Sequence, residues 1–179
     1  MATLMEIYPK YAGDCFTGTD KGTSHSYIEV YDELLSPRIG KGTTLLELGV
    51  ATGKSLLMWN EYLVNGIIHG VDLIPMPKVL QGIPSIIFHQ VDICDKQALE
   101  KEFAGLTFDV IIDDAQHIIE QQVLAISVLM SKLRNGGLYI IEDATIESLP
   151  LFLPYGKVTM LDLRNIKQRY DDVLILIPK

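Results

Sequence analysis

Carboxylates gather at two places in the sequence, each directly after a run of residues that favours a β-strand. Asp113 and Asp114 follow one run, and Glu142 and Asp143 follow the next. If the two runs are neighbouring strands, about 5 Å apart, all four acids crowd one end of the sheet, where unpaired like charges repel. A divalent cation would relieve this repulsion, and all-oxygen ligands favour Mg²⁺, Mn²⁺ or Ca²⁺ over zinc. The alternative is that Asp113 or Asp114 caps the helix that follows.

His117 is the candidate for proton transfer beside these acids. It follows Asp114 by three residues, about one helical turn, so the two side chains can point into one cleft. A histidine next to a carboxylate can act as a general base near neutral pH. The competing interpretation is an ordinary surface histidine at a helix start. His69 and His89 lie within strand patterns and are interpreted as structural.

A glycine-rich turn, "LLELGVATGKS" at 45–55, joins a predicted strand to a predicted helix. Its ending in Gly-Lys-Ser is typical of a phosphate-binding loop, but that loop requires glycine at the position of Leu48. The dinucleotide fingerprint fits only if Ala51 replaces its second glycine, where backbone must approach a pyrophosphate. In favour of nucleotides, Asp72 follows the next strand at the expected distance, and the acidic strand at 108–115 resembles that of ATPases. Because both nucleotide-binding patterns lack a required glycine, at Leu48 or at Ala51, we keep nucleotide binding only as the weaker alternative.

Strand-like and helix-like segments alternate from residue 43 onward, which is typical of a doubly wound α/β sheet. The predicted strands are mostly apolar on both faces, as expected between layers of helices. They cover 43–50, 67–73, 85–93, 108–115, 137–144, 157–164 and 171–179. The helical or connecting stretches cover 26–35, 53–64, 75–82, 95–105 and 117–137, with Asn135-Gly136-Gly137 ending the last. The final two strands have only a short polar connection, so they should pair antiparallel.

The predicted fold is therefore a Rossmann-like seven-stranded sheet, mostly parallel with an antiparallel C-terminal strand. The 179 residues are 48% hydrophobic and 21% charged, and we expect a single domain in which 1–42 cover the cofactor or substrate and 43–179 form the core. The sequence has no signal-peptide pattern and no apolar run near the ~18–20 residues of a membrane span. Two cysteines favour a reduced, cytoplasmic setting. A net charge of −8 with scattered basic residues argues against nucleic acid as a partner.

Three acids and two glycines form a pattern that resembles the class I S-adenosylmethionine-dependent methyltransferases. Glu47-x-Gly49-x-x-x-Gly53 spans the end of the first strand and its turn, Asp72 ends the second strand and Asp92 the third. Ligands of such sheets bind at the carboxyl ends of the strands. The resemblance implies that the loop closes around the methionine part, that Asp72 accepts hydrogen bonds from the ribose, and that Asp92 faces the adenine. Further cofactor contacts are expected from Lys21, Ala51, Ser55, Ile93 and Asp113.

The acids after the fourth and fifth strands resemble a narrower family. It comprises the metal-dependent sugar O-methyltransferases of macrolide biosynthesis and the related cephalosporin hydroxylase-like proteins. The resemblance implies that Asp114, Glu142 and Asp143 ligate Mg²⁺ and that His117 is the general base. It extends to an N-terminal segment, "GTDKGTSHSYIEVYDELL" at 18–35. The residues expected near the cofactor pocket there are Thr19, Lys21, Gly22, His25 and Tyr27.

The implied function is an S-adenosylmethionine- and Mg²⁺-dependent O-methyltransferase acting on a hydroxyl of a small molecule or sugar. Neither nucleic acid nor a membrane is expected as a partner, and a homo-oligomer is an open expectation. The alternative is a module that binds the cofactor without catalysis. Only 42 residues precede the first predicted strand, so we expect the larger N-terminal domain of the macrolide enzymes to be absent.

Overall fold

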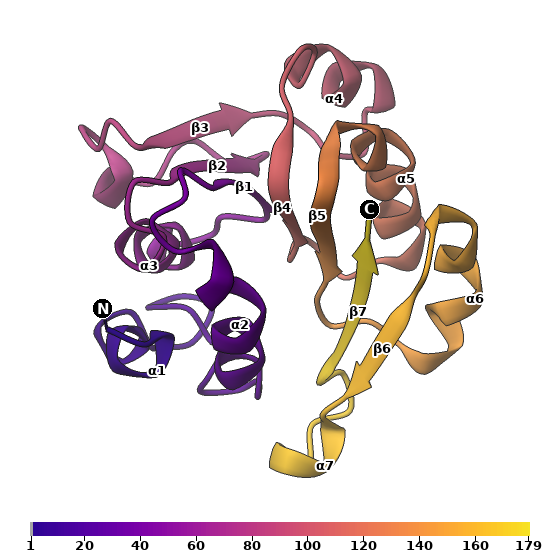
Figure 1. The fold of residues 1–179 in the computed structure, drawn as a ribbon, viewed down its shortest axis with the longest axis horizontal. Coiled ribbons are helices and arrows are strands. Elements are labelled where there is room, and N and C mark those ends of the chain that lie inside the picture. Colours follow the sequence, from indigo (N-terminus) through magenta and orange to yellow (C-terminus); the bar gives the residue numbers. More distant parts are fainter. Residues whose placement is uncertain (1) are drawn as a thin grey trace.

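The computed structural model describes residues 2–179 and contains a seven-stranded sheet (Figure 1). Its strands are β1 (Thr44–Leu48), β2 (Ile67–Asp72), β3 (Ile86–Gln90), β4 (Phe108–Asp113), β5 (Leu133–Ile141), β6 (Thr159–Asp162) and β7 (Val173–Pro178). They lie in the order β3-β2-β1-β4-β5-β7-β6. The strands β1 to β5 are parallel, whereas β7 pairs antiparallel with both β5 and β6. The predicted fold class and the antiparallel pairing at the C-terminus are confirmed.

Helices lie on both sides of this sheet (Figure 1). The α-helices are α1 (Leu4–Ile7), α2 (Ile28–Leu35), α3 (Lys54–Tyr62), α4 (Lys96–Glu102), α5 (Ile119–Leu129), α6 (Leu149–Phe152) and α7 (Arg164–Lys167). Short 3-10 turns are η1 (Tyr8–Lys10), η2 (Ser36–Arg38), η3 (Lys78–Leu80), η4 (Met130–Lys132), η5 (Ile146–Ser148) and η6 (Leu153–Tyr155). Within residues 2–179, no helix combines the length and the apolarity needed to cross a membrane.

Two hydrophobic cores lie on opposite faces of the sheet, because successive strand residues point to opposite sides. On one face, Leu45 and Ile112 pack in a cluster with Trp59 and other residues of α1, α2 and α3. On the other face, Leu46 and Ile111 pack with residues of α4, α5 and α6. Since both faces are buried, the central strands are continuous apolar runs, and polar side chains are left to the strand ends.

The predicted helix over 117–137 is wrong in its second half. The helix α5 ends at Leu129, and β5 already begins at Leu133. The side chain of Leu133 is buried against β4, so apolar burial in the sheet outweighs continuation of the helix. The Asn135-Gly136-Gly137 segment therefore lies inside β5 instead of ending a helix.

The two strand histidines form a chain of contacts that ends on a carboxylate. His69 Nδ1 lies 2.9 Å from His89 Nε2, and His89 Nδ1 lies 2.6 Å from Glu102 Oε1. Both rings are buried and stacked, and Phe103 and Phe108 pack against them. Burial and the neighbouring His89 lower the pKa of His69 to about 4.

We expect this lowered pKa to make folding less favourable in mild acid. The unfolded chain binds a proton on His69 near pH 6.5, whereas the folded chain binds it near pH 4. Protons therefore favour the unfolded state in this window, and on the order of 2 kcal/mol, present above pH 6.5, is lost as the pH falls to 4. Urea unfolding at pH 7 and pH 5 tests this, with His69→Gln as the non-titrating variant. An equal pH dependence in the two proteins would contradict the prediction.

Candidate active site

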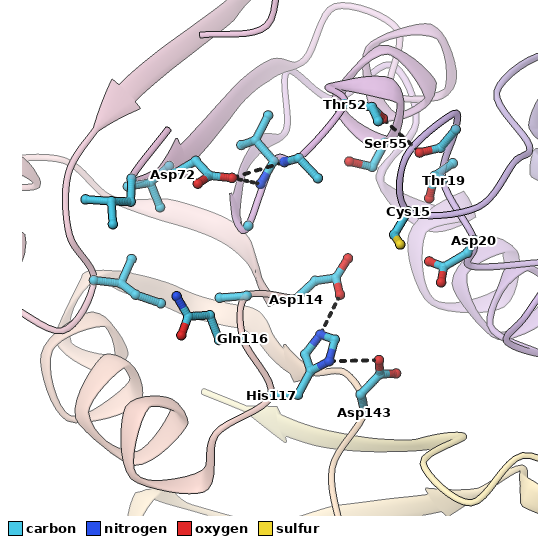
Figure 2. Close-up of a pocket in the computed structure, with 18 of the residues that line it drawn as sticks. Cys15, Thr19, Asp20, Thr52, Ser55, Asp72, Asp114, Gln116, His117 and Asp143 are labelled. Carbon is cyan, nitrogen blue, oxygen red and sulfur yellow. Dashed lines mark hydrogen bonds and ion pairs between the residues drawn. The ribbon is translucent and has the colours of Figure 1, made fainter. Parts of the chain in front are cut away.

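A cavity of about 340 Å³ lies at the carboxyl ends of the parallel strands (Figure 2). Each of the five parallel strands supplies at least one lining residue at or just beyond its end. Gly49 follows β1, Asp72 ends β2, Asp92 follows β3, Asp114 follows β4 and Asp143 follows β5. The volume is typical of a small-molecule site, and the position is where doubly wound sheets bind ligands.

Two segments that are distant in sequence complete the wall of this cavity. The N-terminal segment contributes Asp20 and its neighbours, and it is tied to the glycine turn because Thr52 Oγ1 donates a hydrogen bond of 2.8 Å to the Gly18 carbonyl. The connection between β6 and β7 contributes Arg169. In the same connection, Lys167 Nζ donates to the backbone carbonyls of Gly22, Thr23 and His25. The cavity is thus closed by contacts that no local pattern encodes.

The glycine turn after β1 is held by an acid of β2. Asp72 Oδ2 accepts hydrogen bonds from the backbone amides of Val50 and Ala51, at 2.8 and 3.0 Å (Figure 2). Gly49 has φ +86°, and a Cβ there would lie 2.1 Å from the Asp114 carbonyl oxygen. Glycine is therefore required on two grounds, the left-handed backbone and the close approach of the next loop.

The predicted cofactor residues divide into two groups. Those that line the cavity are Gly49, Ala51, Ser55, Asp72, Asp92 and Ile93. Those predicted but not among the lining residues are Lys21, Glu47, Gly53 and Asp113. Gly53 has φ +80° and begins α3. Asp113 is buried with no hydrogen-bond partner for Oδ2 within residues 2–179, and burial raises its pKa to about 7.

Glu47 is fully buried near the end of β1, just before the glycine turn. Its carboxylate accepts hydrogen bonds from Ser55 Oγ at 2.6 Å and from Trp59 Nε1 at 3.2 Å. Lys21 Nζ lies 3.3 Å from Glu47 Oε1. Glu47 therefore joins α3 to the N-terminal segment.

His117 lies between two carboxylates at one end of the cavity (Figure 2). Its Nε2 lies 3.2 Å from Asp114 Oδ1, and its Nδ1 lies 3.2 Å from Asp143 Oδ2. Both His117 and Asp143 have positive φ, 55° and 51°. Non-glycine residues adopt this strained conformation mainly where the surrounding structure imposes it, often at functional sites. We call Asp114, His117 and Asp143 the outer triad.

The N-terminal segment holds the second oxygen of Asp143. Tyr27 Oη donates a hydrogen bond of 2.7 Å to Asp143 Oδ1, and His25 Nδ1 lies 3.2 Å from the same oxygen. Both rings are buried and stack on each other. The orientation of Asp143 toward His117 is therefore set by residues more than a hundred positions earlier in the chain.

A second group of acids surrounds a buried lysine. Lys21 Nζ contacts Glu142 Oε1, lies 2.6 Å from Asp114 Oδ2 and is 1% exposed. Tyr31 Oη also donates to Glu142 Oε1. Glu142 thus faces inward, and we call Glu47, Asp114 and Glu142 the inner triad. Within each triad, one potential ligand atom per residue lies within 4.8 Å of the others.

Acidic side chains outnumber basic ones in and around these two triads. Burial and the charge of Asp114 raise the pKa of Glu142 well above its usual value, and burial raises the pKa of Asp143. Burial alone would lower the pKa of His117, but the hydrogen bond to Asp114 and the charge of Asp143 raise it overall. Four carboxyl groups thus face two basic side chains, those of Lys21 and His117. Such a cluster of carboxyl oxygens fits a hard divalent cation.

Several cavity residues were not foreseen from the sequence. Those with polar side chains or in loops include Cys15, Gly18, Asp20, Thr52, Gln116 and Arg169. Gln116 and Thr52 are adjacent in sequence to predicted site residues, so their positions in the chain could have indicated that they line the cavity. Arg169 gave no such signal in the sequence, because it lies in an ordinary polar connection. In the structure its guanidinium forms an ion pair with Asp171.

The overall architecture is that of a class I methyltransferase. A putative rRNA methylase from Clostridium thermocellum, only 15% identical, has the same fold with a TM-score of 0.67 over 87% of this chain and 96% of its own. Within the class, this chain is related in sequence to macrolide-type sugar O-methyltransferases, which confirms the resemblance found in the sequence. No protein-family model matches the sequence.

Two relatives and one solved structure define this relationship. The 8-demethyl-8-alpha-L-rhamnosyl tetracenomycin-C 2'-O-methyltransferase of Streptomyces olivaceus is 31% identical over 75% of this chain and 37% of its own length. The L-olivosyl-oleandolide 3-O-methyltransferase of Streptomyces antibioticus is also 31% identical, over 75% and 35%. The MycE methyltransferase of mycinamycin biosynthesis, in complex with Mg and SAH, is 30% identical with a TM-score of 0.69 over 79% and 36%. The chain thus spans little more than a third of these relatives.

Proposed function

We propose that the chain is an S-adenosylmethionine- and Mg²⁺-dependent O-methyltransferase that acts on a hydroxyl of a sugar or another small molecule. The observation that carries the proposal is His117 held between Asp114 and Asp143 at one end of the cavity, with the glycine turn also on its wall. The named activities of the relatives support the reaction class. The Mg and SAH bound in the MycE structure support the two cofactors.

The residues for each cofactor follow from their place at the cavity. The turn from Gly49 to Gly53 and the acids Asp72 and Asp92 would hold S-adenosylmethionine. Asp114 and Asp143 would hold Mg²⁺, together with Glu142 if that side chain turns from Lys21 toward the cavity. When bound, S-adenosylmethionine supplies an electrophilic methyl group, and Mg²⁺ supplies positive charge that lowers the pKa of an acceptor hydroxyl.

The chain's own contribution to the chemistry is positioning and proton transfer. His117 takes the hydroxyl proton, for which its ring must be neutral. Nε2 faces Asp114 Oδ1 and Nδ1 faces Asp143 Oδ2, each at 3.2 Å, so a neutral ring with its proton on Nδ1 can accept the hydroxyl proton at Nε2 only where the hydroxyl takes the place of Asp114 Oδ1. Tyr27 keeps Asp143 in this orientation through its hydrogen bond to Oδ1. The residues of 18–20 line the cavity beside the glycine turn, so we propose that 1–42 serve as the covering segment of a single domain.

Thermal unfolding with candidate ligands tests the proposed cofactor class. We expect S-adenosylmethionine and S-adenosylhomocysteine to raise the melting temperature, because a ligand at 100 times its dissociation constant adds about 2.7 kcal/mol. For a chain of this size, that corresponds to a shift of roughly 5–10 °C. ATP and NAD, each with and without Mg²⁺, are the controls for the nucleotide alternatives. Stabilisation by ATP or NAD but not by S-adenosylhomocysteine would overturn the proposal.

Turnover then separates an enzyme from a cofactor-binding module. Release of S-adenosylhomocysteine is measured with a panel of glycosides and catechols, in Mg²⁺ and after treatment with a chelator. The proposal expects product with at least one acceptor and loss of that product in the chelator. Undiminished turnover without metal would remove Mg²⁺ from the proposal. Binding without product on every acceptor would favour the module.

A further inference from the structure

A second cavity lies at the other end of the parallel strands from the active-site cavity. It has a volume of about 380 Å³ and is found where β1 and β4 begin. Its lining residues are Leu34, Pro37, Arg38, Lys41, Thr43 and Asp109, none of which lines the active-site cavity. Because β1 has five residues, which span about 16 Å, the two cavities are separate sites.

Two basic side chains of this second cavity have no acidic partner. Neither Arg38 nor Lys41 forms an ion pair with any residue of the described chain. Arg38 Nη2 donates a hydrogen bond of 2.9 Å to the Gly136 carbonyl, which orients the guanidinium. Asp109, the acid on the same wall, is neutralised by Arg134, whose Nη1 lies 2.7 Å from its Oδ2. The cavity therefore has an excess of positive charge in a chain whose net charge is −8.

Three backbone amides in the turn over 38–43 also lack an acceptor. The amides of Gly40, Gly42 and Thr43 donate no hydrogen bond to another residue within 2–179. Thr43 is 4% exposed, and buried amides are nearly always paired. Gly40 and Gly42 have φ +72° and +68° on either side of Lys41, and such turns can direct successive N–H groups toward a bound anion.

The turn is already held in shape without a ligand. Thr43 Oγ1 donates a hydrogen bond of 2.8 Å to the Arg38 carbonyl, and the Lys41 amide donates one of 3.3 Å to the same oxygen. A Cβ on Gly40 would meet nothing within 4 Å, so the space beside this part of the turn is open. A ligand therefore meets donors whose positions are fixed in advance, which lowers the entropic cost of binding.

The donors of this turn match a phosphate group better than a carboxylate. A phosphomonoester carries roughly two negative charges and three accepting oxygens, whereas a carboxylate has a single charge and a smaller set of oxygens. The two cations and the unpaired amides together supply enough donors for the larger anion. Arginine also binds phosphate oxygens through directed, charge-assisted hydrogen bonds.

We propose that the turn over 38–43 is a second binding site, which takes the phosphate group of inorganic phosphate or of a small phosphomonoester. Arg38 and Lys41 supply the charge, and the amides of Gly42 and Thr43 supply neutral hydrogen bonds. The site is independent of the proposed methyl transfer, because it shares no lining residue with the active-site cavity.

Amide NMR spectra of the whole chain test the proposal. Inorganic phosphate and glycerol phosphate are titrated separately at neutral pH, with sodium chloride of equal ionic strength as the reference. We expect the signals of residues 38–43 to shift with one or both phosphate compounds and not with chloride, and the tighter binder identifies the source of the phosphate. Lys41→Ala should weaken this binding by about tenfold or more, because a charge-assisted hydrogen bond is lost. Lys101→Ala, at an exposed lysine of α4, is the matched control and should bind as the unaltered chain does.

The outcomes separate this site from the proposed function. Shifts that remain unchanged in Lys41→Ala, or that fall outside residues 38–43, would overturn the inference. Arg38→Gln is the second variant and should also weaken binding, and the spectrum of each variant without ligand reports whether the turn is still folded. A rise in melting temperature with ATP that is lost in Lys41→Ala supports this site. The response to S-adenosylhomocysteine should be the same in both proteins, since it reports on the active-site cavity alone.

Discussion

His117→Ala is expected to slow methyl transfer about 10²- to 10⁴-fold, the usual contribution of a general base. The physical reason is that His117 is the one imidazole on the wall of the described cavity, held by Asp114 and Asp143. Cofactor affinity should change little, because the ring lies across the cavity from the glycine turn and Asp72 (Figure 2). Turnover with an accepted hydroxyl substrate and calorimetric binding of S-adenosylhomocysteine measure the two effects separately.

A control variant in the same segment guards against a local folding defect. Glu120 is exposed at the start of α5, three residues after His117, and is not among the residues that line the cavity. Glu120→Ala should retain turnover within a few-fold of the unaltered chain. Unchanged turnover in His117→Ala would remove the base assignment, whereas parallel losses of turnover and cofactor binding would point to collapse of the cavity.

Gly49→Ala is expected to be the most destabilising of the single substitutions considered. The new Cβ would lie 2.1 Å from the Asp114 carbonyl oxygen, a backbone atom that cannot move without shifting the acid site. The backbone at φ +86° adds about 1–2 kcal/mol of left-handed strain, and overpacking typically adds about 1–3 kcal/mol. Urea unfolding should therefore show a loss of roughly 3 kcal/mol or more, with loss of cofactor binding.

Gly82→Ala separates the steric effect from the backbone strain. Gly82 has φ +78°, nearly the same conformation, but a Cβ there would meet nothing within 4 Å. This variant should therefore lose only about 1–2 kcal/mol. If the two alanine variants unfold at the same urea concentration, close packing of Gly49 against the Asp114 loop is not what requires glycine.

Much of the fold was predictable because its signals are local. The strands β1 to β5 are recognisable as apolar runs, and the short polar link before β7 indicated antiparallel pairing. Six of the predicted cofactor residues line the cavity because the carboxyl ends of parallel strands meet at one edge. The error at the end of α5 arose where a glycine pair resembled a helix stop, while the burial of Leu133 in the sheet decided the boundary.

The sequence by itself determined the class of protein and the set of acids, since strand pattern, glycine spacing and residue type are properties of the chain. Only the tertiary structure decided which of those acids face His117 and which face Lys21. Glu142 and Asp143 are adjacent, yet one faces Lys21 and the other His117. The sequence could not show this division, because Lys21 lies 93 residues from Asp114 and 121 residues from Glu142 in the chain. Packing of the N-terminal segment, which no local pattern encodes, brings its ammonium among the carboxylates.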